Sequence, residues 1–252
     1  MKKILLTLFS LVAVVGLATA ADNVSYTATA DPANNPDGMN QNSTPVDVWQ
    51  VALSNTGGSG TYFGTYGNLA NSWYEYSYLL SSGNGSVDAT HTFTGGALSI
   101  GQTVSLSFLN RGAVAGGSVG LSLMDGSASL ITFSYASGDS VYRYTDAGIS
   151  QQSTSFAWEY QNALQISFTL TSATTYNAKV TDTVNTANWT GTYTGAIDGI
   201  DVFNHAGGNN SDVGFNNLSV VPEPSIWALL VAGGVLLISC RHRLTVVHKA
   251  RI

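Results

Sequence analysis

Paired carboxylates are the first feature of this sequence that could do chemistry, because glycoside hydrolysis uses two of them about 5 to 9.5 Å apart. Asp198 and Asp201 are the closest acidic pair, in Asp198-Gly199-Ile200-Asp201. An Asp-Gly pair is also typical of a hairpin turn, which is the role we expect here. The two glutamates before residue 221, Glu75 and Glu159, each stand alone among aromatic residues. The sequence therefore predicts no catalytic carboxylate pair.

Nucleophilic and metal chemistry have less support. His91 lies in an alternating segment, where we expect a position on a strand surface, and His205 borders a glycine-rich stretch typical of a turn. Asn209 to Asp212 are ordinary turn formers, and the spacing of an EF-hand calcium loop is missing. We therefore predict a non-catalytic protein with no metal site and no cofactor.

Aromatic residues offer a different chemistry, that of binding. Tyrosines cluster in residues 73–78 and around residues 156–160, and four tryptophans occur before residue 221: Trp49, Trp73, Trp158 and Trp189. Exposed rings stack on sugars while neighbouring amides and carboxylates bond the hydroxyls. Large rings also fill the interior of a β fold, which is the reading we favour. A carbohydrate-binding module is the alternative function, and a glycan-active enzyme is the third.

The elements that would position these residues are β-strands. Period-two alternation places Val, Leu and Phe on one face in Val104–Leu109, and a similar pattern recurs in Val119–Met124. Further strand-like segments are Leu130–Tyr135, Val141–Thr145, Leu164–Leu170, Thr175–Val180, Asn188–Thr194, Gly199–Phe203 and Val213–Val220. No proline lies between Pro45 and Pro222, and no helical period competes. The sequence predicts an all-β, antiparallel β-sandwich, with a polar lead-in over residues 21–60 that holds one strand at Val46–Leu53.

Charge is scarce between the two ends of the chain. Residues 21–220 carry fourteen acidic and three basic side chains, a net charge near −11. Nucleic acid and anionic membrane surfaces would be repelled by such a field. The one cysteine, Cys240, lies near the carboxy terminus. We therefore predict no disulfide within residues 21–220, which must be stabilised by their hydrophobic core.

The amino terminus has the three parts of a secretory signal peptide over residues 1–20. Lys2-Lys3 precedes an apolar run, and Ala18-Thr19-Ala20 supplies the small residues that signal peptidase reads, with Ala18 and Ala20 at the cleavage site. Residues 21–220 are therefore expected to form one exported domain, because lysines and arginines at both ends of the chain favour a cytoplasmic location for those ends.

The carboxy terminus combines a rigid motif, an apolar run and arginines over residues 221–243. Val221-Pro222-Glu223-Pro224-Ser225 resists helix formation, because each proline fixes φ and lacks an N–H. The apolar run 226–240 predicts a transmembrane helix of roughly 22 Å, short against a hydrocarbon core of about 30 Å. Arg241 and Arg243 close it, and residues 244–252 are expected as a cytoplasmic tail.

This order of parts resembles the PEP-CTERM sorting signal of exported bacterial proteins. The resemblance implies that a membrane-embedded exosortase recognises the tag and cuts near Pro-Glu-Pro, while a permanent membrane anchor is the alternative. The strand and glycine pattern of residues 73–220 resembles concanavalin-A-like jelly rolls. Together these resemblances imply a protein of the cell envelope or extracellular matrix, with signal peptidase and exosortase as processing partners and exopolysaccharide as a candidate ligand.

Overall fold

The computed structural model describes residues 25–26, 49–54, 61–68, 72–79, 84–113, 116–158, 163–207 and 212–222. Within these ranges every regular element is a β-strand, as the alternation predicts. No helix there is long and apolar enough to cross a membrane. The expected signal helix and transmembrane helix both fall outside the described ranges.

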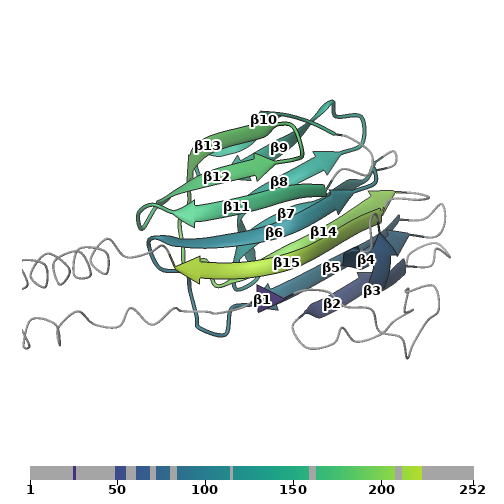
Figure 1. Ribbon diagram of the computed structural model, residues 1–252, viewed down its shortest axis with the longest axis horizontal. Helices are drawn as coiled ribbons and strands as arrows, with labels where there is room; N and C mark the ends of the chain where they lie inside the picture. Colours follow the sequence, from purple (N-terminus) through teal and green to yellow (C-terminus); the bar gives the residue numbers. More distant parts are fainter. Residues whose placement is uncertain are drawn as a thin grey trace, which may run out of the picture. The chain divides into compact units, whose positions relative to one another are not determined.

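Two antiparallel sheets make up the fold (Figure 1). Sheet A has the order β13 (Thr186–Thr192), β12 (Thr175–Thr181), β11 (Ala163–Leu170), β6 (Gln102–Asn110), β15 (Asp212–Pro222), β4 (Ser72–Leu79) and β3 (Thr61–Asn68), and β1 (Ser25–Tyr26) also pairs with β15. Sheet B has the order β10 (Ile149–Ala157), β9 (Val141–Asp146), β8 (Ala128–Ala136), β7 (Ser118–Asp125), β14 (Gly199–Gly207), β5 (Asn84–Thr92) and β2 (Gln50–Ser54). The predicted arrangement of two antiparallel sheets in a β-sandwich is therefore confirmed.

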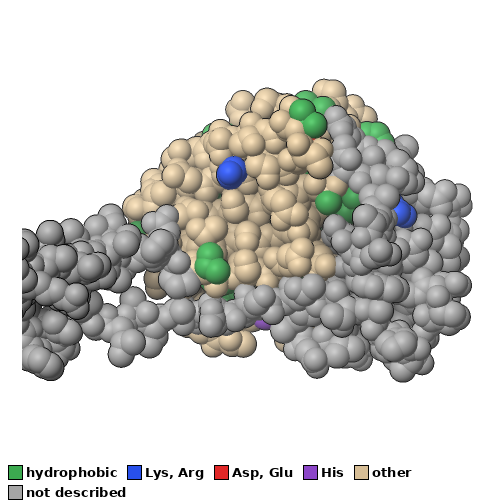
Figure 2. Space-filling view, viewed as in Figure 1, with side chains coloured by type: hydrophobic (Ala, Val, Ile, Leu, Met, Phe, Trp, Pro, Cys, Tyr) green, Lys and Arg blue, Asp and Glu red, His purple; other side chains and the backbone are tan. Residues whose placement is uncertain are grey.

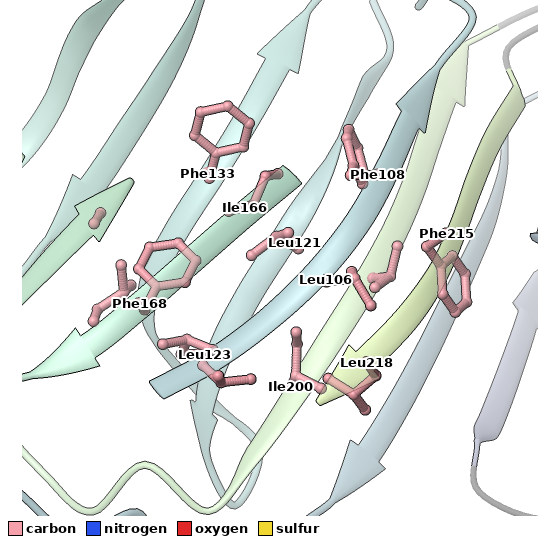
Figure 3. Packing of buried hydrophobic residues seen from close by; sticks show 14 of the residues in the cluster. Leu106, Phe108, Leu121, Leu123, Phe133, Ile166, Phe168, Ile200, Phe215 and Leu218 are labelled. Carbon is pink, nitrogen blue, oxygen red and sulfur yellow. The ribbon is translucent and has the colours of Figure 1, made fainter. Parts of the chain in front are cut away.

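Alternation along each strand explains why the sheets stack. In β6, Val104, Leu106 and Phe108 are at most 2% exposed, while the neighbouring Thr103 and Ser105 remain partly exposed. Figure 3 shows the inward residues of both sheets packed against one another, including Phe133 and Leu121 of sheet B. Burying one such Leu or Phe side chain contributes about 1.5 to 3 kcal/mol, so this layer is the main source of stability.

Several local expectations need correction. Asn84 and Gly85 are residue types typical of turns, but both belong to β5, where they pair with Gly207 and Ala206. The expected strand Asn188–Thr194 ends earlier, since β13 spans Thr186–Thr192. The edge strand β10 was not predicted at all, because most of its residues are exposed and polar and show no alternation.

Candidate functional site

The two aspartates nearest in sequence serve different parts of the fold. Asp198 is not in a hairpin turn of its own; its Oδ1 accepts a hydrogen bond of 2.9 Å from the Gly126 amide and so holds the β7–β8 turn. Asp201 lies within β14 on the outer face of sheet B, since its neighbours Ile200 and Val202 belong to the core. The structure therefore does not use them as a pair.

Asp201 instead belongs to a polar group on β5 and β14, here called the β5–β14 site: Asp88, Thr90, Asp201, Phe203 and His205. The sheet register arranges these residues in three rows. His205 pairs with Ser86 on one side and Ser118 on the other, Phe203 with Asp88 and Gly120, and Asp201 with Thr90 and Ser122. All these positions share one face, because directly paired residues of antiparallel strands point the same way.

His205 is the exposed member of the site. Its Nε2 lies 2.5 Å from Asp88 Oδ1, and its side chain is 49% exposed. The expectation that His205 sits in a turn is wrong, because β14 continues through Gly207. Hydrogen bonding to Asp88 raises the pKa of His205, against the smaller opposing effect of burial.

Asp201 is the buried member. It is 9% exposed although it points away from the core, and its Oδ1 accepts a long hydrogen bond of 3.4 Å from Thr90 Oγ1. Burial and the neighbouring Asp88 carboxylate raise the pKa of Asp201 to about 7, while His205 and Thr90 act in the opposite direction. A carboxylic acid with such a pKa can hold or release a proton near neutral pH.

Phe203 separates these two groups. A Cβ placed on Gly120 would lie 2.8 Å from Phe203 Cζ and 2.3 Å from the Phe133 carbonyl oxygen. Glycine at position 120 therefore lets the Phe203 ring lie close against the sheet. The His205 ring lies next to it, with 4.9 Å between the ring centroids.

A serine also adjoins this site. Ser118 falls in Gly116-Gly117-Ser118-Val119-Gly120, which has the Gly-x-Ser-x-Gly spacing of hydrolase nucleophiles, and it pairs with His205. That motif requires a strand-to-helix turn, whereas Ser118 begins strand β7. The described hydrogen bond of the His205 ring goes to Asp88 and not to Ser118.

The second histidine has a structural role. His91 was expected on a strand surface, but it is 3% exposed and lies on the inner face of β5. Its ring centroid is 5.8 Å from that of Trp49 and 5.9 Å from that of Phe93. His91 therefore belongs to the core.

Trp49, Trp158 and Trp189 lie in or against the core, as the favoured reading predicts. Trp49 is 3% exposed and packs edge-on against Phe215. Trp189 of sheet A stacks on Tyr144 of sheet B at 4.9 Å, and Trp158 stacks on Tyr135 at 5.6 Å. For Trp73 the structure describes the strand, β4, and not the side chain. Among the described residues, the large apolar side chains that are exposed are Ile100, Val184 and Val221, none of which is aromatic.

The outer face of sheet A has a different character from the β5–β14 site. Most outward positions of β6, β11, β12 and β13 carry Ser, Thr, Asn or Gln; Leu109 and its partner Ala163 are apolar, and Lys179 is the one charged residue among them. We call these positions, with Asn217 and Ser219 of β15, the hydroxyl face. In Figure 2 this face is mostly tan, the colour shared by such side chains and the backbone, and no red shows on it.

Side chains of the hydroxyl face are tied to one another. The bonded pairs are Thr103–Thr169 at 2.7 Å, Ser105–Ser219 at 2.8 Å, Ser107–Gln165 at 2.7 Å and Thr190–Asn177 at 2.9 Å. Outward positions recur about every 6.8 Å along a strand and about every 4.8 Å between strands. The result is a regular grid of donors and acceptors.

The same face continues towards β3 and β4. Val213 and Phe215 of β15 are buried in the core, and they pair with Ser77 and Glu75 of β4. The intervening register positions on the opposite face are Tyr62, Tyr66, Tyr74, Tyr76 and Tyr78. Five tyrosine positions therefore adjoin the hydroxyl face along sheet A.

The residues considered for metal binding and for sorting are only partly described by the structure. Within the described ranges, no group of three or more His, Cys, Asp or Glu residues could hold a metal ion. Val221, 47% exposed, and Pro222 end strand β15. Glu223, Pro224, Ser225, Arg241, Arg243 and the signal-cleavage residues Ala18 and Ala20 lie outside the described ranges, as does Asn209-Asn210.

Comparison with known proteins finds no matching family model and no matching curated protein. Similar solved structures include the globular domain of T. cruzi calreticulin, with 10% identity over 81% of this chain and 96% of that chain and a TM-score of 0.48. Others are a family 11 carbohydrate-binding module from Clostridium thermocellum in complex with a beta-1,3-1,4-mixed-linked tetrasaccharide (11% identity, 74% and 95% coverage, TM-score 0.33) and an alginate lyase of polysaccharide lyase family 7 (9%, 79% and 94%, TM-score 0.39). Because these identities and TM-scores are low, function has to be argued from the chain's own residues.

Proposed function

We propose that this protein is an exported, non-catalytic protein of the cell surface or its matrix that binds a neutral polysaccharide through the hydroxyl face. The observation that carries the proposal is the near absence of charge on four adjacent strands of a domain whose net charge is near −11. Exposed sheet faces usually carry charged side chains, which keep them soluble and unpaired.

A grid of hydroxyl and amide groups suits a flat polymer of sugar hydroxyls. Each hydrogen bond contributes about 0.5 to 1.5 kcal/mol, so affinity would come from many of them acting together. The mutual bonds, such as Thr190–Asn177, restrict the side chains before a ligand arrives, which lowers the entropic cost of binding.

Charge argues for a neutral polymer. A domain near −11 repels polysaccharides rich in uronate or sulfate, and Lys179 alone among the outward residues of β6, β11, β12 and β13 could attract them. A screen of the exported protein against neutral and anionic polysaccharides tests this point. We expect retention on neutral polymers; retention on anionic polymers alone would refute the proposal.

Delivery to the surface is a separate part of the proposal. We propose that residues 1–20 direct export and that residues 221–243 act as a PEP-CTERM sorting signal which exosortase cuts near Pro-Glu-Pro. The support is the order of parts in the sequence: the Pro-Glu-Pro motif, the apolar run and the arginines. The intact mass of the protein from its producing cells measures both cleavages.

A further inference from the structure

The β5–β14 site lies on the other sheet and has the opposite chemistry to the hydroxyl face. It places the carboxylate of Asp88 close enough to Asp201 to raise the pKa of Asp201. His205 is bonded to Asp88 and so offsets the charge of that carboxylate. Asp201 is influenced by the charge of His205 but is not hydrogen-bonded to it; its described side-chain bond is with the neutral Thr90.

Asp201 is short of hydrogen bonds for a carboxylate that is nine-tenths buried. Buried carboxylates are normally bonded to several donors, because an unpaired buried charge is costly. Within the described part of the chain, the side-chain hydrogen bond of Asp201 is the long one of 3.4 Å that Oδ1 accepts from Thr90 Oγ1. A ligand that donates hydrogen bonds and carries positive charge would satisfy this group.

Among the described residues of this face, no cation is free to do so. Arg143 of β9, on the same face of sheet B, is already engaged by Asp139 and by Gln151 Oε1, the latter at 3.1 Å. The missing positive charge would therefore come from outside the chain. Divalent metals are a poor fit, since the described residues contain no cluster of three or more metal-ligating side chains.

The surroundings suit a sugar. The side chain of His205 is half exposed, and its ring lies beside that of Phe203. A sugar ring can therefore stack on the His205 ring. Ser86 and Ser118 flank His205, while Thr90 and Ser122 flank Asp201, so hydroxyl groups surround both charged residues. These can exchange hydrogen bonds with sugar hydroxyls at either end of a bound residue.

We infer that the β5–β14 site binds an amino sugar, with the amino group donating to Asp201 and the ring lying against His205. This binding is independent of the hydroxyl face, because the two sites lie on different sheets. It also assigns the domain two ligand chemistries, a neutral polymer on sheet A and an amine-bearing sugar on sheet B.

Titration calorimetry of the exported protein with two soluble probes tests the inference. One probe is a tetramer of β-linked glucosamine with free amines, and the other is its N-acetylated counterpart. At pH 7 and about 0.01 M salt, we expect the free-amine tetramer to bind at least tenfold more tightly, and the preference to shrink at about 0.15 M salt as the ionic contact is screened.

Asp201→Asn is the decisive variant. It keeps the shape of the side chain and removes the charge, so it should abolish the preference for the free amine. Asp182→Asn is the matched control, because it removes one negative charge from the exposed β12–β13 turn and should keep the preference. Thermal melts of both variants show that they fold.

Each other outcome overturns the inference. Equal binding of the two tetramers, no binding of either, or a preference that survives Asp201→Asn would each exclude the amino group as the recognised feature. Shortening of either tetramer by the wild-type protein would contradict the non-catalytic proposal. These probes are soluble and the variant lies on sheet B, whereas the neutral-polymer proposal is tested on sheet A. Failure of the amino-sugar inference therefore leaves the neutral-polymer proposal standing, and failure of the neutral-polymer proposal leaves the amino-sugar inference standing.

Discussion

Tyr176 of sheet A donates a hydrogen bond to Asp146 of sheet B, with 2.9 Å between Tyr176 Oη and Asp146 Oδ2. The same Oδ2 accepts from the Thr192 amide at 3.1 Å, and Oδ1 accepts from the Gly148 amide at 2.9 Å. One buried carboxylate therefore joins the ends of β9, β12 and β13. This contact closes the sandwich at the edge where the aromatic stack of Tyr144 and Trp189 lies.

Loss of the tyrosine hydroxyl should weaken the closure. Tyr176→Phe leaves Asp146 buried with one donor fewer, and such a loss costs about 1 to 3 kcal/mol. Chemical denaturation should show a lower midpoint with an unchanged slope. Tyr144→Phe is the control, because the described contacts give the Tyr144 hydroxyl no hydrogen bond; an equal loss in both variants would show that the Tyr176–Asp146 bond is not the cause.

A methyl group at residue 191 should disturb the same contact by overpacking. A Cβ on Gly191 would lie 2.2 Å from Asp146 Oδ2 and 2.3 Å from Tyr176 Oη. Gly191→Ala should therefore cost about 1 to 3 kcal/mol, measured by thermal unfolding. Thr190→Ala on the same strand is exposed and should change the melting temperature little; a stable Gly191→Ala protein would mean that the contact tolerates displacement.

High pH should destabilise the fold through its buried phenols. Burial raises the pKa of Tyr176 and of Tyr142 above the ordinary value near 10. Both phenols therefore contribute stability that is fully present below pH 10 and is lost as pH rises towards their folded-state pKa values. Unfolding followed between pH 8 and pH 12 should show stability falling from about pH 10 upward; a flat profile would contradict the burial of these hydroxyls.

Asp201 should make stability depend on pH in the neutral range. Its pKa of about 7 in the folded state exceeds the value of 3.8 for an unburied aspartate, so the folded protein binds the proton more tightly. Stability should therefore fall as pH rises from about 4 to 7 and then level off. Asp201→Asn removes this dependence and should stabilise the protein more at pH 8 than at pH 4.5; a larger gain at pH 4.5 would reverse the assignment.

The layers of the fold could be predicted from the sequence, because inward residues such as Val104, Leu106 and Phe108 alternate locally. Strand β10 could not, since Gln151 and Gln152 lie in an exposed edge strand that has no buried face to impose a pattern. The placement of the tryptophans in the core followed from the size expected of the sandwich.

The candidate sites were harder to predict than the layers. Asp88 and His205 are 117 residues apart, and only the pairing of β5 with β14 brings them together. The glycines after His205 resemble a turn, although the strand runs through Gly207. One sequence signal was available, the Gly-x-Ser-x-Gly spacing around Ser118, which marks the strand beside His205. The hydroxyl face could have been inferred from the outward Ser and Thr residues once the strands were paired.

Retention of the exported protein on an insoluble neutral polysaccharide, compared with that of the Asn177→Ala/Thr190→Ala double variant, tests the central claim most directly. The double variant removes a bonded pair at the middle of the exposed strands β12 and β13, and two lost hydrogen bonds at about 0.7 kcal/mol each correspond to roughly tenfold weaker binding. Ser134→Ala on the outer face of sheet B is the control. We predict that the wild-type and control proteins are retained and that the double variant binds roughly tenfold more weakly. Equal retention of all three proteins, or retention of none, would contradict binding through the hydroxyl face.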